Sequence, residues 1–193
     1  MIRLLTSLAA IVTFAITPLF AADAENTLVI KVSGENTGMI EVELLPEIAP
    51  QHVERLKRLA RDGLYDDVVF HRVISGFMAQ TGDVEHGKRL GFDPRYAGTG
   101  SSSMPDLPAE FSDINFDMGI VGMARSQNPN SANSQFFIMF AEGSFLNGQY
   151  TVVGRVSAGQ DVVGRIKKGD QAANGSVQDP DYMQWVKVKA DIE

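Results

Sequence analysis

The side chains that most often carry catalysis lack the spacing that catalysis needs in this sequence. The three histidines, His52, His71 and His86, include no pair four residues apart that could hold a metal on one helix face. No Gly-x-Ser-x-Gly turn exposes a serine nucleophile, and the absence of cysteine excludes a thiol nucleophile and a zinc–thiolate site. The sequence therefore predicts no metal centre and no nucleophilic triad.

Three polar side chains stand out because they lie in or beside strongly apolar segments. Arg72 and Gln80 belong to apolar segments, and Gln135 directly precedes the run Phe136–Phe140. An arginine in such a place must be paired or lie at the rim of a cleft, since burying its charge alone is very costly. In the purely structural interpretation Arg72 pairs with a carboxylate, and three apolar neighbours are ordinary core residues: Phe77, Met78 and Phe137. Periodicity alone favours that structural interpretation.

The elements that position these residues are short strands and two helices. Residues 28–32 and 40–44 alternate in polarity around a glycine-containing turn, which predicts a β-hairpin. Apolar residues at helical spacing after Pro50, with Gly63 as a stop, predict a first helix, and residues 158–168 predict a second. Further strands are predicted at these ranges: 68–74, 77–80, 119–124, 135–140, 150–156 and 185–190.

Many short strands with only two helices predict a mainly β fold, a closed or nearly closed antiparallel barrel capped by the helices. Residues 84–110 are rich in Gly, Ser, Pro and charge, and such a long connection is expected to be an irregular loop that serves a purpose.

The composition is that of one globular domain: 193 residues, 44% hydrophobic and 21% charged. The 17 Lys and Arg residues against 24 Asp and Glu residues give a net charge of −7. This charge argues against nucleic acid as the main partner, because binding a polyanion relies on Lys and Arg. We expect a monomer, because no additional apolar face requires burial.

The first 24 residues have the pattern of a secretory signal peptide. Arg3 precedes the apolar run 4–16, Pro18 interrupts it, and small residues follow at Ala21, Ala22 and Ala24. The apolar run is short for a membrane anchor, which needs about 20 residues. We therefore expect a signal peptide at residues 1–24, cleavage between Ala21 and Ala24, a mature domain at residues 25–193, and a periplasmic protein without membrane association.

Three motifs resemble the signatures of the cyclophilin family of peptidyl-prolyl cis-trans isomerases. They are Phe-His-Arg-Val-Ile-Ser-Gly-Phe-Met-Ala-Gln-Thr-Gly-Asp at 70–83, Gly-Met-Ala-Arg at 122–125 with Asn-Ser-Gln-Phe-Phe-Ile at 133–138, and Phe-Leu-Asn-Gly at 145–148 with Tyr-Thr-Val-Val-Gly at 150–154. Their order and spacing agree from about residue 27 to 188. The resemblance implies a closed eight-stranded antiparallel β-barrel capped by two α-helices, and proline-containing polypeptides as substrates.

The resemblance also implies roles for individual residues. Arg72 would be the catalytic arginine and Gln80 would orient it. The backbone of Ala124 and Arg125 would hold the peptide by strand-like hydrogen bonds, and Gln135 would add a polar contact. The proline pocket would be lined by Phe77, Met78, Phe137 and Leu146, with Phe145 and Tyr150 at its edge.

These residue types suit the rotation of an X-Pro bond, whose barrier of about 18–20 kcal/mol comes from amide resonance. In the twisted transition state the lone pair returns to the proline nitrogen, which can then accept a hydrogen bond from the permanently protonated guanidinium of Arg72. No bond to carbon forms or breaks, so no cofactor is expected.

The sequence departs from the pattern of many eukaryotic cyclophilins at several positions. Ser75 replaces proline, Phe145 replaces tryptophan, Tyr150 replaces histidine and Arg125 replaces asparagine, and the segment 126–134 is one residue longer. Because phenylalanine has no indole N–H to donate, we expect weak binding of the macrocyclic inhibitor cyclosporin.

The sequence leaves two alternatives to a catalytic function. A non-catalytic proline-peptide-binding chaperone module would keep the groove, but the presence of Arg72 and Gln80 together favours the enzyme. A sugar-binding barrel would need exposed aromatic side chains, and one tryptophan with four tyrosines supports it weakly.

Overall fold

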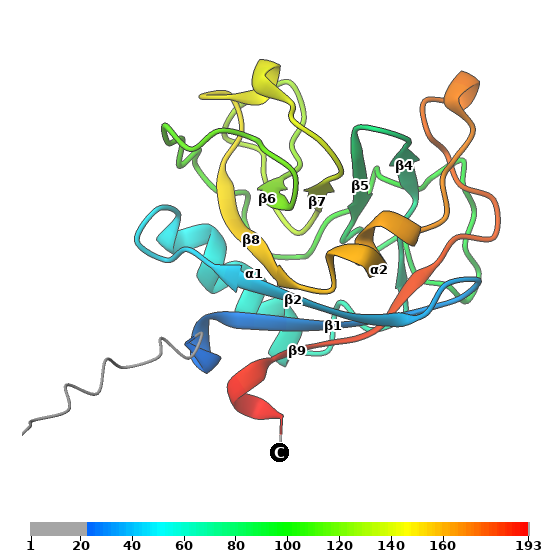
Figure 1. The fold of residues 1–193 in the computed structure, drawn as a ribbon, viewed down its shortest axis with the longest axis horizontal. Coiled ribbons are helices and arrows are strands. Elements are labelled where there is room, and N and C mark those ends of the chain that lie inside the picture. Colours follow the sequence, from blue (N-terminus) through cyan, green and yellow to red (C-terminus); the bar gives the residue numbers. More distant parts are fainter. Residues whose placement is uncertain (1–22, 193) are drawn as a thin grey trace, which may run out of the picture.

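The computed structural model of the protein describes residues 23–192, and these form one curled antiparallel sheet with two α-helices (Figure 1). Within this part of the chain the sheet has nine strands, in the hydrogen-bonded order β3-β9-β1-β2-β8-β6-β7-β5-β4. Their bounds are β1 Thr27–Ser33, β2 Gly38–Leu44, β3 Val68–Val69, β4 Arg72–Ile74, β5 Met78–Thr81, β6 Ile120–Met123, β7 Phe136–Met139, β8 Val152–Ala158 and β9 Tyr182–Val188.

The predicted hairpin is confirmed and forms the centre of the larger core. Strands β1 and β2 pair antiparallel with Ile30 opposite Ile40, and both side chains are fully buried. Alternation of apolar and charged residues along β2 places Val42 and Leu44 in the core while Glu41 and Glu43 remain partly exposed.

The predicted closed eight-stranded barrel is not confirmed, because the single strand expected at residues 68–74 forms two short strands. β3 pairs with β9, whereas β4 pairs with β5. Between them the backbone of Phe70 and His71 bonds outside these ladders: the Phe70 N–H donates to the Asp181 carbonyl at 2.8 Å, and the His71 carbonyl accepts from Val177 N–H at 3.2 Å. The two edges of the sheet are thus consecutive in the chain.

Both predicted helices are present, with one shorter than expected. Helix α1 (Pro50–Arg61) carries Pro50 in its first turn and buries an apolar face against β9. Helix α2 (Gln160–Arg165) begins after Gly159, which has a left-handed φ of +82°, and ends because Ile166 adopts an extended ψ of 130°. The residues 166–168 therefore leave the predicted helix, and 189–191 form a 3-10 turn instead of continuing the last strand.

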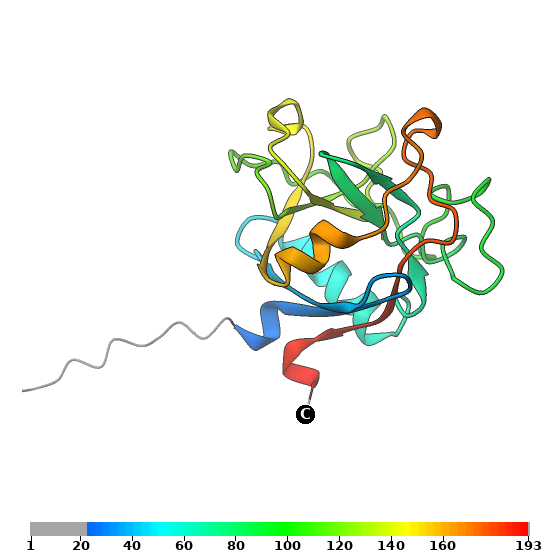
Figure 2. The ribbon, with the colours of Figure 1, turned by 45° about the vertical axis from the view of Figure 1, so that its right-hand side comes forward.

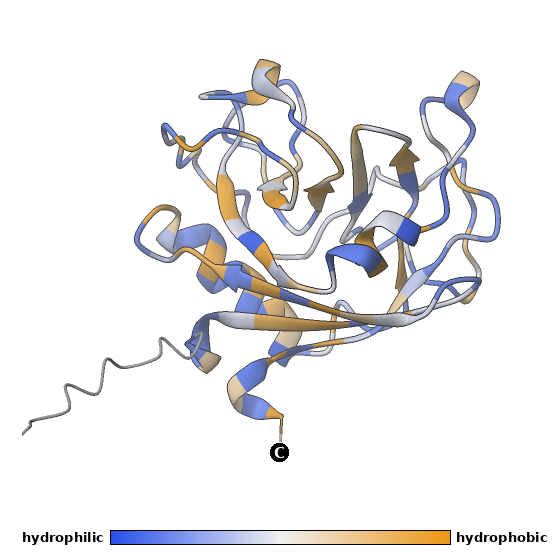
Figure 3. Cartoon of the chain, in the orientation of Figure 1, coloured by the Kyte–Doolittle hydropathy of each residue, from blue (hydrophilic) through white to orange (hydrophobic). Residues whose placement is uncertain are grey.

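The apolar side chains form two separate clusters. The larger one lies around β1, β2, β9 and the helices. The smaller one lies beneath β5, β6 and β7 and consists of Met78, Phe116, Phe137, Met139, Leu146 and Val152. Figure 3 shows hydrophobic residues concentrated on the strands and hydrophilic residues dominating the connecting loops.

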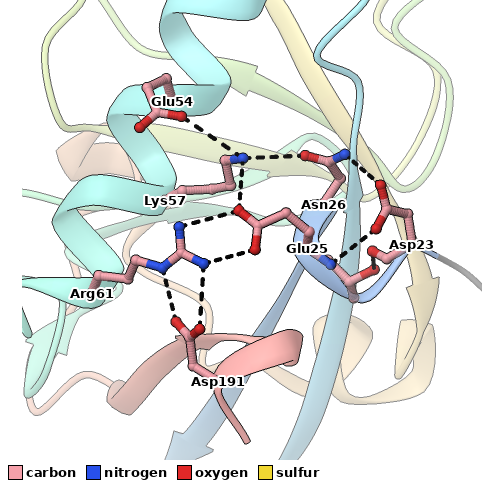
Figure 4. Close-up of polar contacts among 8 residues, drawn as sticks. Asp23, Glu25, Asn26, Glu54, Lys57, Arg61 and Asp191 are labelled. Carbon is pink, nitrogen blue, oxygen red and sulfur yellow. Dashed lines mark hydrogen bonds and ion pairs between the residues drawn. The ribbon is translucent and has the colours of Figure 1, made fainter.

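The two ends of the described chain are fastened to α1 by an ionic network (Figure 4). Arg61 donates to Glu25 at 2.8 Å and to Asp191 at 2.9 Å, and Lys57 donates to Glu25 at 3.2 Å. Hydrogen bonds from Arg61 and then Lys57 lower the pKa of Glu25 to about 2. The ends of the chain therefore lie together, beneath the hairpin in the views of Figures 1 and 2.

The predicted signal segment falls almost entirely on residues 1–22, which lie outside the described residues. Among the helices found in residues 23–192, none has the length and hydropathy that crossing a bilayer requires.

Candidate active site

All the predicted site residues except Gln135 line one open pocket of about 260 Å³. Strands β4 and β5 contribute one side, the segments that follow β6 and precede β8 contribute the other, and β7 forms the base. The lining residues are Arg72, Phe77, Met78, Gln80, Ala124, Arg125, Phe137, Phe145, Leu146 and Tyr150.

The base of the pocket is the smaller apolar cluster. Met78, Phe137 and Leu146 are each at most 6% exposed, so Met78 and Phe137 are buried as the structural interpretation requires, whereas Phe77 is only partly buried. Phe137 stacks on Phe116, with ring centres 5.7 Å apart, and Tyr150 meets Phe137 edge-on at 5.9 Å. At the rim, Phe145 packs on Phe77 at 5.3 Å and remains 64% exposed. The pocket thus has a dry, firmly packed base.

Arg72 lies at the edge of this apolar pocket and is held by neutral oxygens. Its Nη1 donates to Gln80 Oε1 at 3.1 Å, its Nε to the Asn174 carbonyl at 3.1 Å, and its Nη2 to Asn174 Oδ1 at 3.0 Å. Within the described residues no carboxylate forms an ion pair with it, so the alternative in which Arg72 pairs with a carboxylate is wrong. Partial burial lowers the pKa of the Arg72 guanidinium, which stays protonated at neutral pH.

A directional series of hydrogen bonds continues from Arg72 across the sheet. Gln80, which lies opposite Arg72 in the β4–β5 ladder, uses its Nε2 to donate to Gln135 Oε1 at 3.0 Å. Gln135 in turn donates to the carbonyls of Gly98 at 3.0 Å and Gly100 at 2.8 Å. Each amide is therefore fixed in one orientation, with Gln80 presenting its oxygen to the guanidinium.

The loop that receives Gln135 is organised by a buried carboxylate. Asp83 is fully buried and accepts hydrogen bonds from the N–H groups of Gly98 at 2.8 Å and Gly100 at 3.0 Å. A Cβ at Gly100 would overlap Asp83 Oδ1, so only glycine fits there. Residues 84–110 are irregular, as predicted, and part of this loop positions the site.

Gln135 lines a second, more polar pocket of about 320 Å³ beside the first. The two pockets share Gln80, Ala124 and Arg125. Together they form a groove that is apolar at one end and rich in hydroxyl and amide groups at the other.

Sequence reasoning missed Asn174, which supplies two of the three acceptors for Arg72. Its only signal in the sequence is the pair Asn174-Gly175, a combination typical of left-handed turns. That signal predicts a turn, but nothing in the sequence indicates that the turn reaches a residue a hundred positions earlier.

His71 lies directly behind the site and is 4% exposed, with no hydrogen-bond partner for either ring nitrogen in the described structure. Burial lowers its pKa to about 4, so the ring is neutral at neutral pH and adds no charge beside Arg72. Residues 23–192 contain no group of three or more His, Asp or Glu side chains placed to hold a metal ion.

Comparison with known proteins identifies close relatives. Residues 27–188 match the family described as cyclophilin type peptidyl-prolyl cis-trans isomerase/CLD. The chain is 58% identical over 174 residues to a probable peptidyl-prolyl cis-trans isomerase of Brucella suis biovar 1 (strain 1330), covering 90% of this chain and 87% of the relative.

Two solved structures share the fold. The cyclophilin AquaCyp293 from Hirschia baltica has a TM-score of 0.74 at 26% identity, covering 89% of this chain and 77% of that chain. A cyclophilin type peptidyl-prolyl cis-trans isomerase of Cryptosporidium parvum, solved in the presence of the dipeptide Ala-Pro, has a TM-score of 0.69 at 25% identity, covering 84% of this chain and 98% of that chain.

Proposed function

Starting from the membership of this chain in the cyclophilin-type peptidyl-prolyl cis-trans isomerase family, we propose that Arg72 catalyses X-Pro rotation in the 260 Å³ pocket. The protein is an enzyme of this type, and the proposal concerns how its residues perform the reaction. The proline ring binds on the apolar base, while the carbonyl before the proline rotates beside the guanidinium.

The reaction needs stabilisation that appears only when the bond is twisted. Cis and trans X-Pro differ by about 0.5–1 kcal/mol, yet they exchange over tens to hundreds of seconds. At the planar ground state the proline nitrogen has no free lone pair, and at the twisted state it accepts a hydrogen bond from Arg72. An interaction made only in the transition state raises kcat. A 10⁵-fold acceleration requires about 7 kcal/mol, shared among this bond, a water-poor pocket and substrate orientation.

The observation that carries the proposal is the charge balance around Arg72. Its three hydrogen bonds go to amide oxygens, so its position is fixed while its positive charge is not offset by a carboxylate. A charged donor beside an apolar surface interacts strongly with electron density that develops nearby, because little water screens it.

The remaining site residues bind the polypeptide. Met78, Phe137 and Leu146 contact the ring, and Phe77, Phe145 and Tyr150 enclose it at the rim. The backbone of Ala124 and Arg125 lies where the two pockets meet, and the side chain of Gln135 lines the more polar pocket; these groups bind the chain beside the proline. The Ala-Pro dipeptide used with the Cryptosporidium parvum relative supports a proline-containing substrate.

We also propose that the enzyme is exported and accelerates proline-limited folding of exported proteins in the periplasm, as a monomer. The support is the sequence pattern of residues 1–24. Fractionation of the native host, together with the intact mass of the purified protein, tests both the location and the cleavage between Ala21 and Ala24. A full-length protein in the cytoplasmic fraction would contradict this part of the proposal.

The catalytic proposal is tested by cis-to-trans exchange of an X-Pro peptide with wild-type protein, Arg72→Ala and Arg155→Ala. Arg155 is an exposed arginine paired with Glu43 and serves as the matched control. We expect Arg72→Ala to lower kcat/KM by about 10²–10³-fold, as loss of a transition-state donor does, with an unchanged circular dichroism spectrum. Full activity of Arg72→Ala would refute the mechanism, and peptide binding without any acceleration by wild type would favour the non-catalytic chaperone.

A further inference from the structure

Arg125 and Tyr150 form one wall of the proline pocket, with the guanidinium of Arg125 over the Tyr150 ring. Arg125 follows β6 and Tyr150 precedes β8, and the guanidinium carbon lies 4.4 Å from the centre of the Tyr150 ring. On its other side the ring meets Phe137 edge-on at 5.9 Å. Tyr150 is therefore held between a cation and the aromatic base of the pocket.

The guanidinium of Arg125 is itself fixed by main-chain carbonyls of two loops. Nε and Nη2 donate to the Gln149 carbonyl at 3.2 and 2.8 Å, and Nη1 donates to the Ser126 carbonyl at 2.8 Å. Gln149 precedes Tyr150, whereas Ser126 begins the polar turn that follows β6. Arg125 thus connects the two loops and keeps its guanidinium over the ring, whereas the single ammonium group of a lysine could not make all these hydrogen bonds in one plane.

Tyr150 has few other restraints on its orientation. Its hydroxyl makes no hydrogen bond within the described residues, and the side chain is only partly buried at the pocket mouth. A cation over an aromatic face contributes a modest attraction that is larger where water is partly excluded. Arg125 is therefore the polar contact that holds the Tyr150 ring against Phe137.

The two residues are also two of the positions at which this chain differs from the eukaryotic pattern. Arg125 stands at the position of an asparagine and Tyr150 at that of a histidine. The structure brings both differences into direct contact, so each of the two residues provides the interaction partner of the other.

We propose that Arg125 is a positioning residue that acts through Tyr150 to set the width of the proline pocket, so that the pair controls KM and leaves kcat to Arg72. This inference rests on the proposed binding of proline in the 260 Å³ pocket. It assigns the Arg125 side chain a role distinct from that of its backbone.

A double-mutant cycle of Arg125→Gln, Tyr150→Leu and the double variant tests the proposal, with kcat and KM measured separately on one X-Pro peptide. We expect each single variant to raise KM about three- to tenfold with kcat within about twofold, and the double variant to be no worse than the worse single variant. Arg125→Lys should recover part of the loss, since it keeps a cation near the ring.

Arg89→Gln is the matched control, because Arg89 lies 4.7 Å from the Tyr182 ring on a different face and should leave KM unchanged. Additive effects of the two single variants on KM, or a loss confined to kcat, would overturn the inference. If the wild type is active in that experiment, the proposed function stays intact. An inactive wild type, or Arg72→Ala with full activity, would instead remove the proposed function on which it rests.

Discussion

Asn174 holds Arg72 with both of its oxygens: the main-chain carbonyl accepts from Nε and the side-chain Oδ1 accepts from Nη2, at 3.1 and 3.0 Å. This double contact depends on the left-handed backbone of Asn174, whose φ is +54°. Asparagine is among the few residues other than glycine that adopt this conformation readily. Asn174 thus combines a backbone requirement with a side-chain acceptor at one position.

Replacing Asn174 with glycine separates these two contributions. Asn174→Gly keeps the left-handed turn and the main-chain acceptor, and it removes only Oδ1. We expect kcat/KM to fall by about tenfold, the equivalent of roughly 1.5 kcal/mol for one lost hydrogen bond to a charged group. Asp179→Gly, at another exposed left-handed position with a φ of +48°, should be fully active. Equal activities of the two variants would show that Oδ1 does not position Arg72.

Placing a carboxylate next to Arg72 should lower kcat/KM much more than the same change from amide to carboxylate elsewhere on the protein. In Gln80→Glu the new side chain still accepts from Arg72, but it offsets the positive charge and can no longer donate to Gln135. We expect kcat/KM to fall by about tenfold or more, measured by the same exchange assay. Gln184→Glu, an exposed change of the same charge on β9, is the control and should retain activity. An active Gln80→Glu would contradict the role of an uncompensated arginine.

His71 should make stability depend on pH below neutrality. Its folded-state pKa of about 4 lies below the ordinary value of 6.5, so between these values the unfolded chain binds more protons than the native chain. The free energy of unfolding therefore falls as the pH falls from about 6.5 to 4, by up to roughly 3 kcal/mol from this residue. Burial also lowers the pKa of His52, which adds a contribution of the same sign.

Urea unfolding at several pH values between 4.5 and 7 measures this dependence. His71→Leu removes the titrating ring and should show a shallower pH dependence, the remainder coming from His52 and from carboxylates such as Glu25. The same slope in wild type and His71→Leu would show that protonation of His71 does not destabilise the fold.

Phe145 should set the response to cyclosporin. Its ring lies on Phe77 at the pocket rim and is 64% exposed, so a larger indole can take its place without displacing the core. We expect weak inhibition of wild type and at least tenfold stronger inhibition of Phe145→Trp. The reason is that the added neutral indole N–H donor contributes about 1 kcal/mol or more in a desolvated contact. Nanomolar inhibition of wild type, measured in the isomerisation assay, would contradict this prediction.

Local patterns predicted most of the secondary structure. Alternation along residues 28–44 and helical spacing after Pro50 were sufficient, because β2 and α1 bury one face each and β1 pairs with β2 along its length. The break at Phe70 and His71 was missed, since both residues suit a strand and only the partners of their backbone groups, Val177 and Asp181, divide it. Helix α2 was predicted too long because the extended backbone of Ile166 has no local sequence signal.

The candidate site could be predicted where a continuous motif supplies it and not where distant loops complete it. Arg72 and Gln80 lie in one motif and face each other in a ladder, so their proximity follows from the strand pairing. Arg72 also donates to Asn174, and Gln135 donates to the carbonyls of Gly98 and Gly100. Such contacts depend on the course of long loops, which propensities do not determine.

The ionic network around Arg61 holds the segments that contain Asp23 and Ile192 together (Figure 4). These segments lie on the side of the molecule away from η2 (Ser144–Leu146) and the Asn174 turn (Figure 1). An affinity handle or a covalent link to a solid support next to residue 23 or residue 192, the ends of the described chain, therefore leaves the substrate groove facing outward. The immobilised enzyme can consequently be offered unfolded client chains in a flowing solution, whichever end is attached.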